Sequence, residues 1–348
     1  MSAHKSILEA FVKLGMHIKD FCENHKTDES GTYQDIENVI LNAGQQNGWF
    51  TRENILFSLE QWSKELTHEN LTEWLSQYKQ KNTQEPKTIG IVMAGNIPLV
   101  GFHDFLCVLL SGNKVLAKLS SNDTVLLPFF AEFLIAQEPN LNEKIEFTEG
   151  KFEEYDAVIA TGSNNTSRYF EYYFGKKPNI IRKNRNAVAV LTGKETKDQL
   201  QNLGKDIFRY YGLGCRNVSK VYVPEGYAFD EFFKAIFDFR EIIHQHKYAN
   251  NYDYNKAVYL MSEFKILDNG FLVLKEDKSL SSPIASLFYE YYGSISKLKE
   301  ELEQQKDNIQ CVVSKGLLPN EVDFGETQKP RLKDYADGID TLEFLLQL

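Results

Sequence analysis

The sequence predicts an α/β protein with two lobes, each built on a parallel β-sheet, and a helical region at the N-terminal end. From Thr88 onward, short β-branched runs alternate with helical segments, and strands that alternate with helices form parallel sheets with right-handed crossovers. Before Thr88 the apolar residues recur at helical spacing instead. The length of 348 residues also favours more than one domain.

The first predicted region, residues 1–85, consists of helices. Its apolar residues follow one another at intervals of three or four along two stretches. These residues are Ile7, Phe11, Leu14, Ile18 and Phe21, then Ile55, Leu59, Trp62 and Leu66. Thr32, Thr51 and Thr67 stand where helix N-caps are expected. The polar segment KQKNTQEPKT at residues 79–88 has no large apolar side chain and predicts a connector.

The second predicted region, residues 86–195, is an α/β domain. Helices are expected around Phe102–Leu110 and through Leu126–Ile135, with Gly112 as a helix stop and Asp123 as a helix start. Between and after them we expect the strands TIGIVMA, KVLAKL, KIEF, DAVIATG and AVAVL. This order gives a parallel sheet, and parallel sheets bind ligands in the loops at the C-terminal ends of their strands.

The third predicted region, residues 196–325, is a second α/β domain. A helix from Leu200 to Tyr211 leads into a further set of strands. These strands are VSKVYV, AVYLM, FLVLK and CVVSK. A C-terminal segment, residues 326–348, combines a polar stretch with an apolar end.

Composition excludes several classes of function. The formal net charge is −10, and no cluster of Lys and Arg offers a surface for nucleic acid or an anionic membrane. The first residues lack the pattern of a secretory signal, and no apolar stretch is long enough to span a bilayer. We therefore expect a cytoplasmic protein without membrane insertion. The four cysteines are widely spaced, so we expect neither disulfides nor a metal site.

The segment RYYGLGCRNVSKVYVPEG places Cys215 between flexible glycines and a strand, with Arg216 beside it. A neighbouring cation favours the thiolate, which is the nucleophilic form of cysteine. The alternative is a small buried hydrophobic residue, and this is our prediction for Cys22, Cys107 and Cys311. The segment GLGCRN follows a helix, so it does not predict an ordinary dinucleotide-binding turn.

Four segments carry a family resemblance in a fixed order. They are GIVMAGNIPLVGF, GNKVLAKLSSND, ATGS, and GLGCRNVSKVYVPEGYAFDEF, which has Lys220 five positions after Cys215. They resemble the strand with an Asn-Pro turn, the strand with Lys and Ser, the Thr-Gly-Ser turn and the nucleophile segment of the aldehyde dehydrogenase superfamily. Within it, the chain is similar to the acyl-CoA reductases of the LuxC type. The resemblance covers about residues 88–325 and implies an aldehyde dehydrogenase-like fold.

The resemblance implies roles for four further residues besides the nucleophile. Asn96 would stabilise the oxyanion together with the backbone N–H of Cys215; alternatively it is a turn residue before Pro98. Lys118 would reach the adenosine ribose of a nicotinamide cofactor, or it is a solvated lysine at a strand end. Gly162 and Ser163 would form the turn whose helix receives the cofactor pyrophosphate; the alternative for Ser163 is an ordinary N-cap.

Three departures from the family pattern refine the expected chemistry. Ser121 stands where NAD-preferring relatives have a Glu that binds the ribose hydroxyls, so the resemblance favours NADP(H) over NAD(H). The stretch IIRKNRNAVAVL lacks the Glu that activates water in hydrolytic relatives, so an acyl-cysteine would survive until reduction. The Glu of the E-x-F-G-P motif is also absent, because Pro283 follows SLSS.

The predicted function is the NAD(P)H-dependent reduction of a fatty acyl-CoA to the aldehyde through an acyl-Cys215 intermediate. Two alternatives stay open within the superfamily: a reductase of acyl phosphates and an aldehyde oxidiser. A non-catalytic subunit that presents an acyl group to another enzyme is a third. Because relatives use their C-terminal segments in dimer contacts, the resemblance also implies a homodimer with residues 326–348 at the contact.

Overall fold

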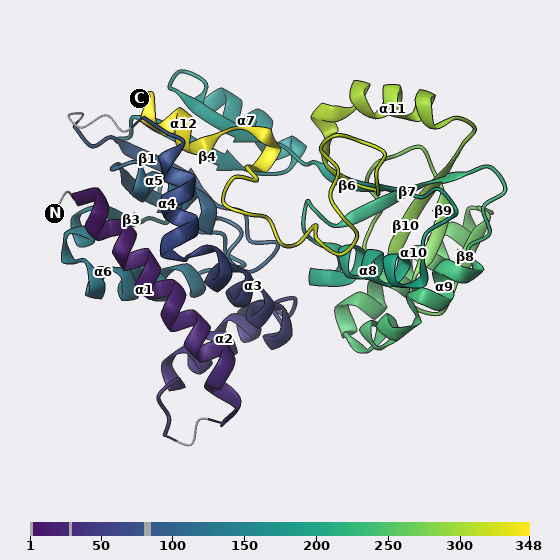
Figure 1. Ribbon diagram of the computed structural model, residues 1–348, viewed down its shortest axis with the longest axis horizontal. Coiled ribbons are helices and arrows are strands. Elements are labelled where there is room, and N and C mark those ends of the chain that lie inside the picture. Colours follow the sequence, from purple (N-terminus) through teal and green to yellow (C-terminus); the bar gives the residue numbers. More distant parts are fainter. Residues whose placement is uncertain (1–2, 28–29, 80–84) are drawn as a thin grey trace. The chain divides into compact units, whose positions relative to one another are not determined.

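The computed structural model describes residues 3–27, 30–79 and 85–348. The predicted connector therefore lies partly outside the described residues. Two compact units make up the chain (Figure 1). Unit 1 comprises the residues up to Lys183 together with Arg331–Leu348, and unit 2 comprises Asn184–Pro330.

Unit 1 begins with a group of helices, as the apolar spacing predicts. They are α1 (Ala3–Asn24), the short 3-10 helix η1 (His25–Thr27), α2 (Gln34–Gln46), α3 (Arg52–Glu65) and α4 (His68–Ser76). Thr51 and Thr67 cap α3 and α4 by accepting hydrogen bonds from backbone N–H groups three residues later. The expectation for Thr32 is wrong, because α2 has Tyr33 at its N-cap and no side-chain capping bond.

The first sheet has five parallel strands in the order β3-β2-β1-β4-β5. Their bounds are β1 (Thr88–Val92), β2 (Lys114–Lys118), β3 (Ile145–Phe147), β4 (Ala157–Thr161) and β5 (Asn179–Arg182). The direction of strand addition reverses between β1 and β4. In open α/β sheets this is the position where ligands bind, outside the carboxyl ends of the two strands.

Helices enclose this sheet. They are α5 (Phe102–Leu110), α6 (Leu126–Gln137), the 3-10 helix η2 (Pro139–Glu143) and α7 (Asn164–Phe174). Ile89 and Ile91 of β1 share one core with Phe105 of α5 and Phe11 of α1. The C-terminal elements η6 (Ala336–Gly338) and α12 (Thr341–Leu346) return to unit 1, where α12 contacts α5 (yellow in Figure 1).

The second sheet has six strands in the order β11-β6-β7-β10-β9-β8, parallel except for the pair of β8 and β9. Their bounds are β6 (Asn186–Val190), β7 (Val218–Pro224), β8 (Ile266–Asp268), β9 (Val273–Glu276), β10 (Ser286–Tyr292) and β11 (Ile309–Val313). The run AVAVL was expected in the first sheet, but β6 pairs with β7 and β11 in the second. A local apolar pattern identifies a strand without specifying its neighbours.

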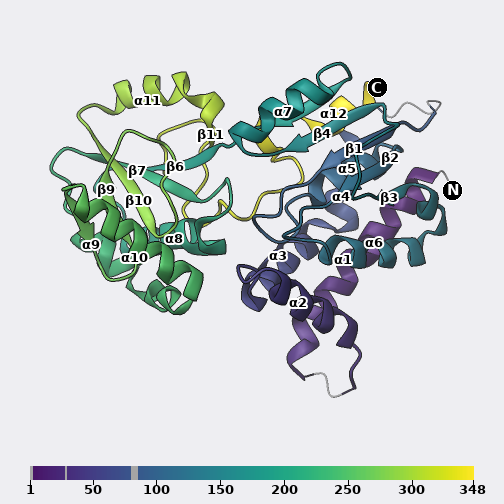
Figure 2. The ribbon, with the colours of Figure 1, turned by 180° about the vertical axis from the view of Figure 1, so that it is seen from behind.

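Helices cover both faces of the second sheet, with α8, α9 and α10 on one side and α11 on the other (Figure 2). They are α8 (Lys197–Phe208), η3 (Arg209–Gly212), α9 (Asp230–Ala235), η4 (Phe237–His244), α10 (His246–Met261), α11 (Ile295–Gln304) and η5 (Lys306–Asn308). In β6, Ala187 and Ala189 pack into one core, and Val188 and Val190 into the other. The expected strand AVYLM is wrong, since these residues form the end of α10.

None of the helices in the described ranges combines the length and apolarity needed to cross a bilayer.

Candidate active site

Five of the six predicted site residues lie in unit 1, at one edge of the first sheet. Each ends or follows β1, β2 or β4, which are adjacent parallel strands. These residues are Asn96, Lys118, Ser121, Gly162 and Ser163. The four residues that were expected to hold the cofactor therefore lie at the same end of the sheet as Asn96, which was expected to stabilise the oxyanion, near the strand-order reversal where such sheets bind ligands. Cys215 lies in unit 2.

The loop that carries Asn96 is fixed to the end of β2. The N–H of Met93 donates to the carbonyl of Lys118 over 3.0 Å. A Cβ on Gly95 would lie 2.5 Å from the Oγ of Ser120, so only glycine permits this close approach of the two loops. Asn96 follows at once and is half-buried. The packing of two strand ends thus holds the backbone just before Asn96.

Asp123 also joins the loop after β1 to the loop after β2. The sequence pattern predicted only a helix start at this residue. Its Oδ2 accepts a hydrogen bond of 3.1 Å from the N–H of Leu99, a residue with a left-handed φ of 57°. Burial raises the pKa of Asp123 to about 6, against the lowering effect of its backbone hydrogen bonds. No local sequence pattern signals this role, because Leu99 lies 24 positions away from Asp123. Asp123 holds the turn Asn96–Leu99 in place.

Lys118 ends β2 with a half-buried side chain, and its Nζ donates to the carbonyl of Gly150 over 3.2 Å. Gly150 belongs to the loop after β3, the next strand of the sheet. Ser121 lies on the exposed loop beyond β2. Both residues therefore lie at or just beyond the carboxyl end of β2.

Gly162 and Ser163 connect β4 to α7. Ser163 is the N-cap of α7, and its Oγ accepts from the N–H of Thr166 over 3.2 Å. A Cβ on Gly162 would lie 2.9 Å from the ring of Phe170, so the turn packs directly on the helix. The alternative of an ordinary N-cap is present in the structure. An N-cap at Ser163 is compatible with anion binding, because the cap oxygen and a bound anion both accept hydrogen bonds from the N–H groups at the start of α7.

Cys215 lies on the loop between η3 and β7, and its side chain is exposed. The chain before it contains three consecutive residues with left-handed φ, namely 54° at Tyr210, 59° at Tyr211 and 77° at Gly212. Residues other than glycine hold this conformation at a cost of about 1–2 kcal/mol each. Such strain persists only where the surrounding structure fixes the backbone.

Asn217 fixes that backbone. Its buried side chain donates through Nδ2 to the carbonyls of Asp206 and Arg209 over 2.9 Å each. Its Oδ1 accepts a hydrogen bond of 2.8 Å from the N–H of Gly214. These bonds join the C-terminal end of α8 to the residue before Cys215 and satisfy carbonyls that the helix leaves without intrahelical partners.

A second brace comes from the segment after β11. The carboxylate of Asp206 accepts from the N–H of Gly325 over 2.6 Å, and from the N–H and hydroxyl of Thr327 over 3.0 and 2.9 Å. The Nε of Arg216 donates to the carbonyl of Thr327 over 2.7 Å. Arg216, expected only as a cation beside Cys215, therefore also anchors the loop. Asp206 escaped sequence reasoning because Gly325 and Thr327 are 119 and 121 positions away. The partners of Asn217 are near in sequence, but they are backbone groups, which no residue pattern reveals.

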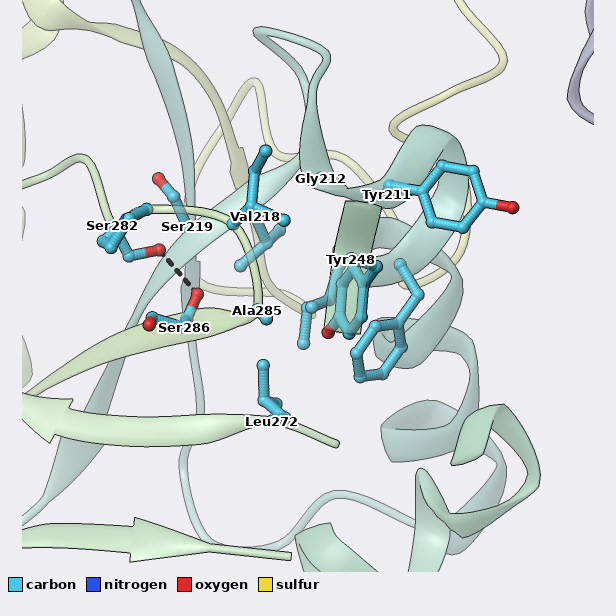
Figure 3. Close-up of a pocket in the computed structure, with 13 residues that line it drawn as sticks. Tyr211, Gly212, Val218, Ser219, Tyr248, Leu272, Ser282, Ala285 and Ser286 are labelled. Carbon is cyan, nitrogen blue, oxygen red and sulfur yellow. Dashed lines mark hydrogen bonds between the residues drawn. The ribbon is translucent and has the colours of Figure 1, made fainter. Parts of the chain in front are cut away.

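A small cavity lies beside the Cys215 loop (Figure 3). Tyr211, Gly212 and Val218, which flank the loop on both sides, line it together with Ser282 and Ser286. The hydroxyl of Ser282 donates to the carbonyl of Ser286 over 2.7 Å, as Figure 3 shows. The cavity of about 20 Å³ has room for about one water molecule and not for an acyl chain.

The surroundings of Cys22, Cys107 and Lys220 indicate structural roles for these residues. Cys107 is fully buried, and burial raises the pKa of its thiol. Burial of Cys22, together with Glu60, raises its thiol pKa to about 11. Lys220 on β7 is fully buried, and its Nζ donates to Glu290 over 2.6 Å and to the carbonyl of Lys278 over 2.9 Å. These residues support the fold around the loop, and Cys215 is the exposed thiol among the four.

Comparison with protein-family models identifies one family. The family model for acyl-CoA reductase (LuxC) matches residues 17–282. No curated protein sequence matches the chain.

Several solved structures with the same fold are aldehyde dehydrogenases. Aldehyde dehydrogenase 21 from Physcomitrella patens, solved with the reaction product succinate, is 12% identical with a TM-score of 0.70, covering 100% of this chain and 84% of that one. The NAD-dependent enzyme from Sinorhizobium meliloti is 12% identical with a TM-score of 0.64, covering 94% and 72%. The Bacillus cereus enzyme, solved with NAD⁺, is 11% identical with a TM-score of 0.61, covering 90% and 72%. The expected aldehyde dehydrogenase-like fold is confirmed.

Proposed function

The chain belongs to the LuxC family of acyl-CoA reductases, and we propose that it reduces a fatty acyl-CoA thioester to the aldehyde through an acyl-Cys215 intermediate. The observation that carries this proposal is the exposure of Cys215 on a loop braced by Asn217 and by Thr327. A nucleophile must reach its substrate and must also be held in one position, and this loop meets both requirements.

The first step is transfer of the acyl group to Cys215. The thiolate sulfur attacks the carbonyl carbon, and the carbonyl oxygen takes the electron pair and becomes an oxyanion. Asn96 and the backbone N–H of Cys215 are the proposed donors to this oxyanion. When the carbonyl re-forms, the bond to the sulfur of coenzyme A breaks and coenzyme A leaves as its thiolate. The product is a thioester on Cys215.

The first sheet fits a nicotinamide cofactor. The N-terminal end of α7 at Ser163 offers N–H groups and a positive helix end to a pyrophosphate. We assign Lys118 to the adenosine ribose because it ends β2, two strands away from β4 in the same sheet. Ser121 leaves no carboxylate to repel a 2′-phosphate, which supports NADPH over NADH. When bound, the nicotinamide would supply the hydride that reduces the thioester to the oxyanion of a thiohemiacetal. The oxyanion re-forms a carbonyl as the aldehyde leaves, the carbon–sulfur bond breaks, and the sulfur of Cys215 keeps the bonding electrons as a thiolate.

The lack of a water-activating carboxylate supports reduction over hydrolysis. The stretch that carries this Glu in hydrolytic relatives includes β5 and β6 here, and in β6 the residues after Asn186 are buried Ala and Val side chains. With no general base in this stretch, the thioester on Cys215 would react slowly with water. The intermediate then persists until the hydride arrives.

The test is loss of NADPH absorbance in the presence of a panel of acyl-CoA esters, with detection of the aldehyde. Wild-type protein should oxidise NADPH and form aldehyde, Cys215→Ala should do neither, and Cys22→Ala serves as the matched control with full activity. Turnover of acyl phosphates but not of CoA esters would contradict the proposed substrate. Absence of any turnover by folded protein would favour a subunit that only presents an acyl group.

A further inference from the structure

A buried charge cluster lies at the end of β5, on the side of the sheet covered by α5 and α12. The guanidinium of Arg182 binds the carboxylate of Asp104 through two bonds, Nη1 to Oδ2 over 2.5 Å and Nη2 to Oδ1 over 2.9 Å. Its Nη2 also donates to the Oγ1 of Thr341 over 2.9 Å. The side chains of Arg182 and Asp104 are 6% and 8% exposed, and Thr341 is fully buried.

The cluster joins three parts of unit 1 that are distant in sequence. Asp104 comes from α5, Arg182 is the last residue of β5, and Thr341 is the first residue of α12 in the C-terminal segment. Burying two charges costs several kcal/mol per ion, and an apolar pair can be equally stable. A two-bond contact between a guanidinium and a carboxylate does, however, fix the direction of both groups. The arrangement therefore points to a requirement for exact placement of Arg182.

The backbone carbonyl of Arg182 connects this cluster to the turn between β4 and α7. Its carbonyl accepts a hydrogen bond of 3.3 Å from the N–H of Gly162, the residue that begins the turn between β4 and α7. On its other side Gly162 packs on α7, since a Cβ there would lie 3.0 Å from Thr166 and 2.9 Å from Phe170. The turn is thus confined between Arg182 and the helix, and any shift of Arg182 moves Gly162 and the cap residue Ser163.

We propose that Arg182, held by Asp104 and Thr341, is a positioning residue for the cofactor-binding turn Gly162–Ser163. The C-terminal segment thereby contributes to cofactor affinity, although it is far in sequence from the turn. This inference rests on the proposed function, in which the N-terminal end of α7 receives the cofactor pyrophosphate. It predicts that a change at Thr341 alters cofactor binding and leaves acyl transfer to Cys215 unchanged.

The test compares Thr341→Val, which removes the hydroxyl but keeps the branched shape, with Thr341→Ser, which keeps the hydroxyl. NADPH binding is measured by fluorescence titration, and Cys215 acylation by mass spectrometry without cofactor. We expect the Kd for NADPH to rise roughly five- to tenfold in Thr341→Val, because a hydrogen bond to a buried charge is lost. Thr341→Ser should bind NADPH like the wild type, and the acylation rate should be the same in all three proteins.

Tyr78→Phe controls for general loosening of the C-terminal segment. The hydroxyl of Tyr78 contacts Asp340 over 2.7 Å and Tyr335 over 2.6 Å, and neither bond involves Arg182. This variant should have a lower Tm and an unchanged Kd for NADPH. Should Thr341→Val fail to fold, Thr341→Ala replaces it with the same readouts, because it removes the hydroxyl without setting a methyl against the guanidinium.

The outcomes separate this inference from the function on which it rests. Wild-type affinity for NADPH in Thr341→Val, or an equal loss of affinity in Tyr78→Phe, would overturn the positioning role while the reductase function stands. If wild-type protein binds neither NADPH nor NADH, the proposed function and the positioning role both fail.

Discussion

The side-chain oxygen of Asn217 accepts a hydrogen bond of 2.8 Å from the backbone N–H of Gly214, the residue that precedes Cys215. The amide nitrogen of the same side chain donates to two carbonyls at the end of α8. One buried side chain therefore sets the distance between a helix end and the proposed nucleophile. The rate at which Cys215 is acylated should therefore report on the conformation of this loop.

Asn217→Ala should weaken both the fold of unit 2 and the reactivity of Cys215. The change leaves the N–H of Gly214 and the carbonyls of Asp206 and Arg209 without these partners, so the free energy of unfolding should fall by about 3 kcal/mol. Acylation of Cys215 by an acyl-CoA should slow by roughly tenfold, because the loop no longer holds the thiol in one position. This corresponds to an increase of about 1.4 kcal/mol in the activation free energy. Urea denaturation and mass spectrometry measure the two effects. A wild-type acylation rate in the destabilised variant would show that the loop needs no brace.

Thr196→Ala tests whether the reactivity of Cys215 responds to any loss of stability in α8. Thr196 and Gln199 form a capping box at the start of this helix, with hydrogen bonds of 2.8 and 3.2 Å. Removing the cap should lower the free energy of unfolding by about 1 kcal/mol. Because the cap lies at the opposite end of α8 from Asn217, the acylation rate should stay at the wild-type value. If Thr196→Ala also slowed acylation, the slow acylation of Asn217→Ala would reflect the loss of stability and not the loss of the brace on the Cys215 loop.

Asp206→Asn should remove a pH dependence of stability. Burial raises the pKa of Asp206 to about 6 from a usual value of 3.8, against the lowering effect of its hydrogen bonds. The folded protein therefore binds this proton more tightly than the unfolded chain does. The contribution of Asp206 to the free energy of unfolding should be largest below about pH 4, fall as the pH rises to about 6, and then level off, a change of about 3 kcal/mol.

Denaturation of wild type and Asp206→Asn at a series of pH values isolates this group. The pKa of Asp123 is also raised to about 6, but Asp123 is present in both proteins and cancels in the difference. The wild-type value minus the variant value should fall between about pH 4 and pH 6 and be constant above that range. A difference that does not change with pH would mean that Asp206 titrates normally in the folded protein.

Gly95→Ala should impair cofactor binding by separating two loops. The added Cβ would lie 2.5 Å from the Oγ and 2.6 Å from the Cβ of Ser120, so the loops after β1 and β2 must move apart. Overpacking of this kind costs about 1–3 kcal/mol, and the Kd for NADPH should rise by roughly tenfold or more. Gly44→Ala is the control, because an added Cβ in α2 meets only the carbonyl of Phe50, at 3.2 Å. Equal Kd values for both variants and the wild type would contradict the placement of the cofactor at this edge.

Local sequence patterns predict most strands and helices of this chain, because a strand or helix with a buried face repeats its apolar residues at a fixed spacing. The run KVLAKL is a strand for this reason, and Leu126–Ile135 a helix. The run AVYLM is too short to distinguish the two, and in α10 its residues Val258, Leu260 and Met261 are exposed. Here the helix packs through Tyr248, Tyr252 and Tyr259 instead.

The sequence points to candidate site residues where the motif is continuous, as at Cys215 and at Gly162–Ser163. It does not reveal two of the supports near these residues, because those supports act over long separations. Asp206 binds Thr327 across 121 positions, and Arg182 binds Thr341 across 159. No local spacing pattern contains such pairs, and an isolated Asp or Arg in the sequence is most often a surface residue.

The most direct test of the central claim is intact-protein mass spectrometry after the chain is mixed with an acyl-CoA in the absence of a reductant. We predict a single acyl adduct located on Cys215, absent in Cys215→Ala and present in Cys22→Ala, which NADPH then discharges with release of the aldehyde. An adduct on another residue, or oxidation of NADPH by the Cys215→Ala variant, would contradict the covalent mechanism.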